Sequence, residues 1–280
     1  MPHSRQTMWQ LPGVIAAAML VLSSAAGAQE RVASLEDAQQ LFYNARYVES
    51  VEKAASIVPA DEDMALTVDE VRASALLFEI KRLLAPQRKT STKELLKRCI
   101  PCPDLLKAFA EVNSRGQAAA RARLAQHPGD ETALFFVGKF DLNYVWLQLG
   151  PLGRKTGWNE YWEARKSLDT LLKQRPDHVR GRTARAWMEY VVDTKLPWGT
   201  EWIMGGGDRR KALTWAREAA GSDADRFTRA EAEFALWEML VHERRVPEAM
   251  DVATRLAANF PENKDVAKFV DAKGVAPADR

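Results

Sequence analysis

The stretch from Arg229 to Glu262 constrains the fold more than any other part of the chain, because it holds two amphipathic patterns separated by a break. Apolar residues recur at spacings of three and four, the stripe of a helix that buries one face. The break falls at Arg244-Arg245-Val246-Pro247, where Pro247 suits the first turn of a second helix, and Pro261 then stops that helix. The two stripes consist of Phe234, Leu236, Trp237, Leu240 and Val241, and of Ala249, Val252, Ala253 and Leu256.

This helix–turn–helix unit resembles a tetratricopeptide repeat (TPR), a pair of antiparallel helices of about 34 residues. With Pro261 as the closing proline, Ala249 occupies a small-residue position of the family and Leu236 an apolar position of its first helix. Trp237 and Leu256 depart from the pattern, because the family places small residues there. The resemblance implies an all-α fold, an irregular TPR-like solenoid of stacked antiparallel helical hairpins. A repeat of this kind implies an architecture and not an activity.

The rest of the chain predicts further helices of the same kind with irregular spacing. We expect a short hairpin over residues 35–58 and a longer helix over residues 64–84, opened by the capping box Thr67-x-x-Glu70. Another hairpin is predicted over residues 103–126, with its turn at Asn113-Ser114-Arg115-Gly116. Single helices are predicted over residues 132–149, 158–172, 179–192 and 209–220. We expect the first of these, 132–149, to be nearly enclosed by other helices.

Residues 1–28 are predicted to be a cleaved signal peptide. A basic start precedes a short apolar core, Val14–Leu22, which is too short to span a bilayer. The small residues Ala26-Gly27-Ala28 predict cleavage after Ala28, and the alternative is an uncleaved N-terminal anchor. We expect a bacterial protein that is periplasmic or secreted and soluble once processed, with no transmembrane segment in the mature chain. The remaining parts are a TPR-like helical domain over residues 29–272 and a flexible C-terminal tail over residues 273–280.

Composition and charge fit a folded domain without a highly charged partner. Hydrophobic residues make up 46% of the chain, which is enough for a sizeable core. The formal net charge is +2, and removing Arg5 with the signal peptide lowers it to +1. Nucleic-acid binding is therefore not predicted, because it normally requires a strongly basic surface.

Cys99-Ile100-Pro101-Cys102 contains the only two cysteines of the sequence. In an exported chain we interpret Cys99 and Cys102 as a structural disulfide that fixes a corner between two hairpins. The alternative is a thiol-redox motif, which requires a thiol with a lowered pKa. A helix that starts at Pro103 would favour this, because its positive N-terminal end would lie near Cys102. A zinc site is not predicted, because no second cysteine pair or nearby histidine supplies the other ligands.

Three glycines, Gly205-Gly206-Gly207, precede the basic helix start Asp208-Arg209-Arg210-Lys211. Glycines before a helix can turn backbone N–H groups toward an anion. The phosphate-loop pattern is not present, because the Gly-Lys-Ser/Thr sequence and its strand–loop–helix setting are both missing. We interpret the glycines as a tight turn with Asp208 as the N-cap, and anion binding as the alternative.

Tryptophans cluster in the second half of the chain. We interpret four of them as core residues at helix contacts, namely Trp162, Trp187, Trp215 and Trp237. Others lie in or beside two long loops, 150–157 and 193–207, and either pack over the interior or line a groove. Binding residues concentrate in long loops on rigid scaffolds, so these loops are the predicted rim of any groove. The candidate binding residues are Arg154, Trp158, Trp198, Trp202 and Arg209.

No catalytic pattern is visible in the sequence. None of the histidines at 127, 178 and 242 is followed by a second ligand at a metal-binding spacing, and Gly-x-Ser-x-Gly and His-Glu-x-x-His do not occur. Acidic residues such as Glu160 and Glu163 are interpreted as a solvated helix face. We predict a protein without enzymatic activity, cofactor or metal, which binds an unidentified protein or peptide of the cell envelope through the concave face of stacked hairpins.

Two alternatives predict different features. The layout and the Gly-Gly start of a late helix resemble the TPR-built accessory component of TRAP-type solute transporters, whose members are exported and arrange helical hairpins around a pore or cleft. That resemblance implies a small-ligand-binding protein with an enclosed cavity lined by Trp198, Trp202 and Arg154 or Arg209, whereas a scaffold predicts an open groove. A thiol oxidoreductase would instead expose a reactive Cys99.

Overall fold

The computed structural model describes residues 34–85, 91–195 and 204–274, and within these ranges the chain is helical and contains no strand. The predicted all-α class is confirmed, whereas the predicted signal peptide lies outside the described residues. No described helix combines the length and the apolar character needed to cross a membrane. The helices are one over residues 34–43, α2 (Tyr47–Ala55), α3 (Glu62–Leu83), α4 (Thr92–Arg98), α5 (Cys102–Gln126), α6 (Glu131–Leu149), α7 (Trp158–Gln174), α8 (Val179–Lys195), α9 (Arg209–Ala220), α10 (Arg226–His242), α11 (Val246–Asn259) and α12 (Lys264–Gly274).

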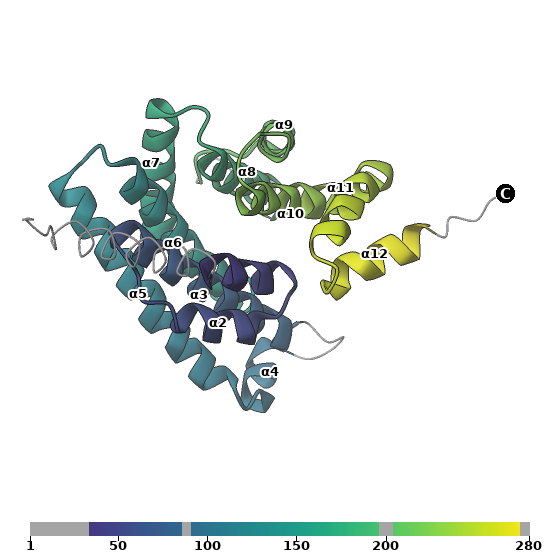
Figure 1. Ribbon diagram of the computed structural model, residues 1–280, viewed down its shortest axis with the longest axis horizontal. Helices are drawn as coiled ribbons and strands as arrows, with labels where there is room; N and C mark the ends of the chain where they lie inside the picture. The colour runs from purple at the N-terminus through teal and green to yellow at the C-terminus, as the bar shows by residue number, and fades with distance from the viewer. Residues whose placement is uncertain (1–33, 86–90, 196–203, 275–280) are drawn as a thin grey trace, which may run out of the picture.

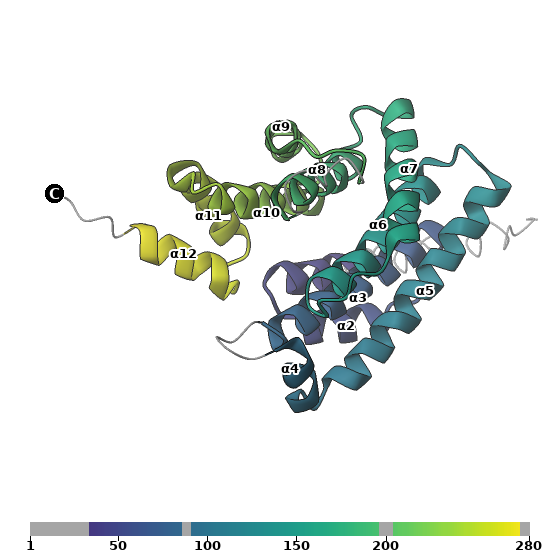
Figure 2. The ribbon, with the colours of Figure 1, turned by 180° about the vertical axis from the view of Figure 1, so that it is seen from behind.

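Neighbours in the chain are neighbours in space. From α5 onward each helix packs against the next one, and α3 packs against α2, α5 and α6. Figures 1 and 2 show two groups of helices, one formed by α2 to α7 and the other by α8 to α12, which meet near α6 and α8. Such consecutive packing is typical of chains built from successive helical hairpins.

Helix α8 joins two separate hydrophobic cores. One face of α8 contributes Ala184 and Met188 to the core of the first group, and the opposite face contributes Ala186 and Tyr190 to the core of the second. Residues four apart lie on the same face of a helix, whereas residues two apart lie on nearly opposite faces. Helix α8 is therefore the seam between the two groups.

Aspartate or serine side chains cap the starts of α3, α4, α6, α9 and α10, in agreement with the N-cap preference. Asp208 accepts a hydrogen bond from the backbone N–H of Lys211 at 2.9 Å, so its predicted capping role is confirmed. The predicted capping box at Thr67 is wrong, because α3 starts earlier. Its N-cap is Asp61, which accepts from the N–H of Met64, and Glu70 lies in the helix interior.

The predicted hairpin over residues 103–126 is also wrong, because α5 runs through it as one helix of 25 residues. Gly116 does not break the helix; a Cβ at this position would overlap the ring of Phe140 on α6. Asn113 donates from Nδ2 to the carbonyl oxygen of Phe140 at 3.1 Å. The residues expected to form a turn therefore allow α6 to approach α5 closely. The fully buried or nearly buried positions along α6 confirm the prediction of an enclosed helix.

The N-terminal helix of the described chain packs against the C-terminal helices. The ring of Tyr43 stacks on Phe234 with centroids 5.5 Å apart and contacts Phe260 at 5.2 Å. Asn263 donates from Nδ2 to the carbonyl oxygen of Tyr43 at 2.8 Å, and the N–H of Glu262 donates to Asn44 Oδ1 at 3.1 Å. Contacts between segments about two hundred residues apart thus join the two groups of helices a second time.

A largely buried cluster of four charged side chains, each with no more than 21% of its surface exposed, lies where α3, α6, α8 and α10 meet. Lys139 Nζ is 3.4 Å from Glu70 Oε1 and also pairs with Glu231. Arg180 bonds both carboxylates, Glu70 at 2.9 Å and Glu231 at 2.8 Å. Burial alone would raise the pKa of Glu231, but Lys139 and Arg180 lower it to about 2. Two cations and two anions therefore balance in a site with little access to water.

Replacement of Glu231 by Gln is expected to destabilise the fold by about 3 kcal/mol at pH 7, because Lys139 and Arg180 then remain buried with half of their counter-charge. The corresponding fall in Tm is roughly 10 °C for a chain of this size, measured by circular dichroism. The folded-state pKa of Glu231 is lowered, so its stabilisation is present above the unfolded pKa and is lost as the pH falls toward 2. The effect of the substitution should shrink accordingly at acid pH.

The matched control is Glu238→Gln on the same helix. Glu238 is partly exposed, and its carboxylate comes no closer than 4.0 Å to Lys81 Nζ, which makes a weak ion pair. Its loss should therefore change the free energy of unfolding by less than about 0.5 kcal/mol. Equal effects of the two substitutions at pH 7 would contradict a central role for the cluster.

Candidate functional site

The structure places three of the five predicted binding residues; Trp198 and Trp202 lie outside the described residues. Arg154 is exposed in the loop before α7, where its N–H donates to the carbonyl oxygen of Gln148 at 2.7 Å. Trp158 begins α7 and is 45% exposed. Arg209 begins α9, where its N–H donates to Asp193 Oδ2 at 2.8 Å and its guanidinium lies 3.8 Å from Glu243.

Two tryptophans form an exposed aromatic face on α7. Trp162 is 43% exposed, so its predicted place in the core is wrong. The buried face of α7 is filled by Tyr161, Ala164 and Leu168, and Trp162 projects to the side of it. Because Trp158 and Trp162 are four residues apart, they lie on the same side of the helix, one turn from each other. The other tryptophans interpreted as core, Trp187, Trp215 and Trp237, are partly buried against the second hydrophobic core as predicted.

Arg165 ties this aromatic face to the glycine turn before α9. Its guanidinium lies 5.9 Å from the centre of the Trp162 ring, within the range of a cation–π contact. The same guanidinium donates to the carbonyl oxygens of Met204 and Gly205, each at 2.9 Å. The Tyr161 hydroxyl also donates to Met204 at 3.0 Å. The turn is thus fixed on the side of α7, and we call Trp158, Trp162 and Arg165 the α7 face.

Two of the N–H groups that follow the glycine turn already have partners within the protein. Gly205 and Gly206 have φ values of +77° and +79°, a conformation that glycine adopts without strain, as the tight-turn interpretation requires. The first N–H groups of the following helix are already bonded, that of Arg209 to Asp193 and that of Lys211 to Asp208. The contacts of the turn to Arg165 use carbonyl oxygens, which attract cations rather than anions.

Asp141 is a fully buried carboxyl group with an altered pKa. It accepts hydrogen bonds from Gln117 Nε2 and Arg121 Nη2, each at 2.7 Å, and Arg121 also bonds Glu163 at 2.7 Å. Burial raises the pKa of Asp141 to about 7, although the Arg121 guanidinium opposes the shift. Glu163, predicted to be part of a solvated face, is therefore half of an ion pair between α5 and α7. The hydrogen bonds of Asp141 join α6 to α5, so its protonation affects the stability of this helix pair.

The two cysteines are bonded to each other. Their sulfur atoms are 2.00 Å apart, and the bond links the end of α4 to the first residue of α5. Cys102 is fully buried and Cys99 is partly buried. The structural interpretation expected a disulfide at a corner between two hairpins, and the bond lies instead at a corner between the two helices α4 and α5. The redox alternative requires an accessible sulfur. In the described ranges, no group of three or more histidine, cysteine or acidic side chains is arranged to hold a metal ion.

The charges at the centre of the fold were missed by the sequence analysis. Glu70, Lys139, Arg180 and Glu231 come from four helices, and no local spacing connects them. One signal was readable: Lys139 and Asp141 interrupt an otherwise apolar helix that was expected to be enclosed. Charged residues in such a helix require buried partners.

The comparisons with known proteins add no family to this picture. No protein-family model, curated protein or solved structure matches the chain. The interpretation of the α7 face therefore depends on its own exposure and contacts.

Substitution of Asp141 by Asn should change the pH dependence of stability. The folded-state pKa of about 7 lies above the ordinary value of 3.8, so stability falls as the pH rises between these values while the unfolded chain releases its proton first. The Asn side chain does not ionise, so the stability of the variant should not fall with pH for this reason. Its free energy of unfolding relative to the wild type should rise by about 2 kcal/mol between pH 5 and pH 8, measured with urea. Asp251→Asn, an exposed change on α11, is the control, and a pH-independent difference for Asp141→Asn would contradict the assignment.

Proposed function

We propose that the chain is an exported TPR-like scaffold that binds another protein or a peptide of the cell envelope and has no catalytic activity of its own. The proposal includes an irregular solenoid of helical hairpins and removal of residues 1–28 on export. It is supported by the packing of consecutive helices and by the unit that resembles a TPR. There α10 and α11 pack together, and Ala249, at the small-residue position of the family, is fully buried.

The α7 face is the observation that carries this proposal. Large apolar side chains on a monomer surface mark interaction sites when they are grouped, and Trp158 and Trp162 are grouped one turn apart. Tryptophan and arginine dominate the binding energy of protein interfaces. Arg165 fixes the orientation of Trp162 through its bonds to the glycine turn, so part of the face is ordered before a partner arrives.

The surroundings of the α7 face indicate the chemistry of the partner. Arg154 and Lys155 are exposed in the loop that leads into Trp158. A matching segment would place apolar side chains on the two tryptophans and carboxylates beside these two cations. Opposite charges at the edge of an interface raise the association rate and fix the register.

The second candidate function is that of a small-ligand-binding accessory protein of a solute transporter. It is favoured by a polar hollow that lies between the end of α9 and helices α10 and α11. This hollow is lined by neither Arg154 nor Arg209, the residues that the sequence analysis assigned to a cavity.

The scaffold proposal predicts that a photo-crosslinking amino acid at position 154 captures a specific protein in cells, identified by mass spectrometry of the adduct. The double substitution Trp158→Ala and Trp162→Ala should lower the yield of this adduct at least about tenfold, because two interface anchors worth about 1–2 kcal/mol each are lost. Its Tm should fall by only a few degrees, since neither side chain belongs to a hydrophobic core and nearly half of each is exposed.

Two controls accompany this experiment. Val241→Ala removes an exposed apolar side chain from α10 and should leave the yield unchanged. A crosslinker at the exposed position of Lys107 on α5 should give no enriched protein. The scaffold proposal fails if position 154 captures nothing beyond what position 107 captures, or if the tryptophan substitutions leave the adduct intact.

A further inference from the structure

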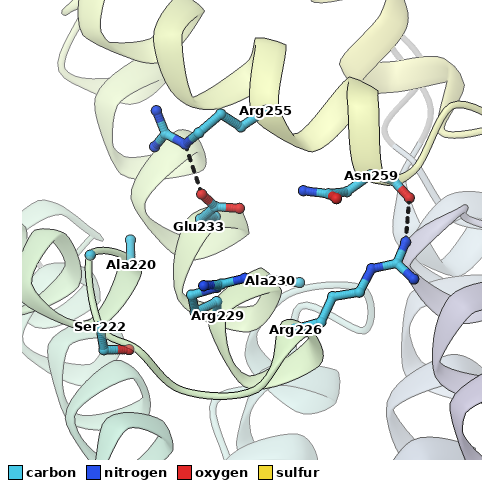
Figure 3. Close-up of a pocket in the computed structure, with 9 residues that line it drawn as sticks. Ala220, Ser222, Arg226, Arg229, Ala230, Glu233, Arg255 and Asn259 are labelled. Carbon is cyan, nitrogen blue, oxygen red and sulfur yellow. Dashed lines mark hydrogen bonds and ion pairs between the residues drawn. The ribbon is translucent and has the colours of Figure 1, made fainter.

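A hollow of about 340 Å³ opens between the last residues of α9 and helices α10 and α11 (Figure 3). Arg226, Arg229 and Glu233 lie along one side of α10, at spacings of three and four that place them on one helix face. Arg255 and Asn259 border the hollow from α11. Three arginines and one glutamate give this lining a formal charge of +2 (three minus one), because its other members are uncharged.

Arg226 is held in place by contacts on three sides. Its Nη2 donates to the carbonyl oxygen of Asn259 at 2.8 Å, at the C-terminal end of α11. The guanidinium also lies 5.3 Å from the ring centre of Phe260 and 5.4 Å from that of Phe227. A cation at a helix C-terminus is stabilised by the partial negative charge of the last carbonyls. Only part of the guanidinium fork is used in this way, so other donors remain for a ligand.

Arg255 is fixed on the opposite side of the hollow. Its Nε donates to Glu233 Oε1 at 2.9 Å, and its Nη1 donates to the carbonyl oxygen of Asp251 at 3.2 Å. Glu233 is buried, so the pair does not swing freely in solvent. Figure 3 shows Arg255 and Glu233 joined across one side of the hollow and Arg226 joined to Asn259 on the other.

Arg229 lies between these two fixed arginines. In the described part of the chain its side chain makes no hydrogen bond or ion pair, although it borders the same hollow as Arg226 and Glu233. The backbone start of α10 is already capped, because Asp225 accepts from the N–H groups of Phe227 and Thr228. Any anion in the hollow would therefore be bound by guanidinium groups and not by the helix N-terminus.

We propose that this hollow is a binding site for a small phosphate monoester. A phosphate group carries close to two negative charges at neutral pH and three acceptor oxygens, which match the charge of the lining and its three arginines. The planar fork of arginine suits phosphate oxygens. A single carboxylate would leave one positive charge of the lining without compensation. The volume lies at the small end of ligand pockets, so it admits a phosphate with a short organic group.

This site does not depend on the proposed scaffold function. The α7 face and the hollow are built from different helices, so a phosphate ligand and a protein partner can be tested separately. Failure of the crosslinking experiment at position 154 would leave the phosphate site untouched, and the reverse also holds.

Isothermal titration of the purified protein with glycerol 3-phosphate tests the proposal. We expect saturable 1:1 binding that Arg229→Gln weakens at least about tenfold, because a charge-assisted contact is worth about 1.5–3 kcal/mol. This variant should fold normally, since Arg229 has no partner to lose within the described residues. Glu233→Gln should tighten binding by about threefold, because it removes the one negative charge of the lining.

The matched control is Arg210→Gln, which removes an exposed arginine of α9 outside the hollow and should leave the affinity unchanged. The proposal is overturned if glycerol 3-phosphate does not bind at millimolar concentration, or if Arg229→Gln and Arg210→Gln weaken it equally. Succinate is titrated in parallel. If the dicarboxylate binds as tightly as the phosphate ester, the site recognises charge alone and the phosphate assignment is wrong.

Discussion

The fold depends on a balanced set of buried charges. Glu70, Lys139, Arg180 and Glu231 meet between the two hydrophobic cores, which helix α8 and the packing of the N-terminal helix also join. Charges taken out of water are costly unless each is paired, so this cluster tolerates few arrangements of the four helices that carry it. Apolar packing holds each group of helices together, and the charges add to the contacts of α8 and Tyr43 in setting how the groups are oriented. We regard this specificity as the main contribution of the cluster.

That fixed orientation positions both candidate binding surfaces. Arg180 belongs to α8, which packs against α7, and Arg165 on α7 holds Met204 and Gly205 of the turn before α9. Glu231 belongs to α10 and lies between two residues of the arginine-lined hollow, Arg229 and Glu233. The opposite sides of α10 thus serve different purposes, one facing the central charges and the other facing the hollow. A substitution in the charge cluster that shifted α10 would also shift the residues of α10 that line the hollow.

The sequence predicted what local periodicity determines. The bounds of α9 and the place of its cap at Asp208 agree with the structure, as does the enclosed character of α6. Long-range packing decided the rest. Glycine is common in turns, so the sequence predicts a turn at Gly116. It lies inside α5, where the missing side chain leaves room for the ring of Phe140. The exposure of Trp162 and the convergence of three arginines on one hollow likewise depend on how α7, α10 and α11 are placed by their neighbours.

The packing of the first described helix on the last ones has a consequence for how the chain matures. Tyr43 and Asn44 contact Phe227, Phe234, Phe260, Glu262 and Asn263, which follow them in the chain by 184 to 220 residues and are synthesised later. Contacts of such long sequence separation form late, because the loop they close is long. The side chain of Tyr43 therefore lacks these contacts until α10 and α11 have been synthesised. A chain truncated before α11 would lack α11 and α12, and Tyr43 and Asn44 would also lose their contacts with Phe260 and Glu262.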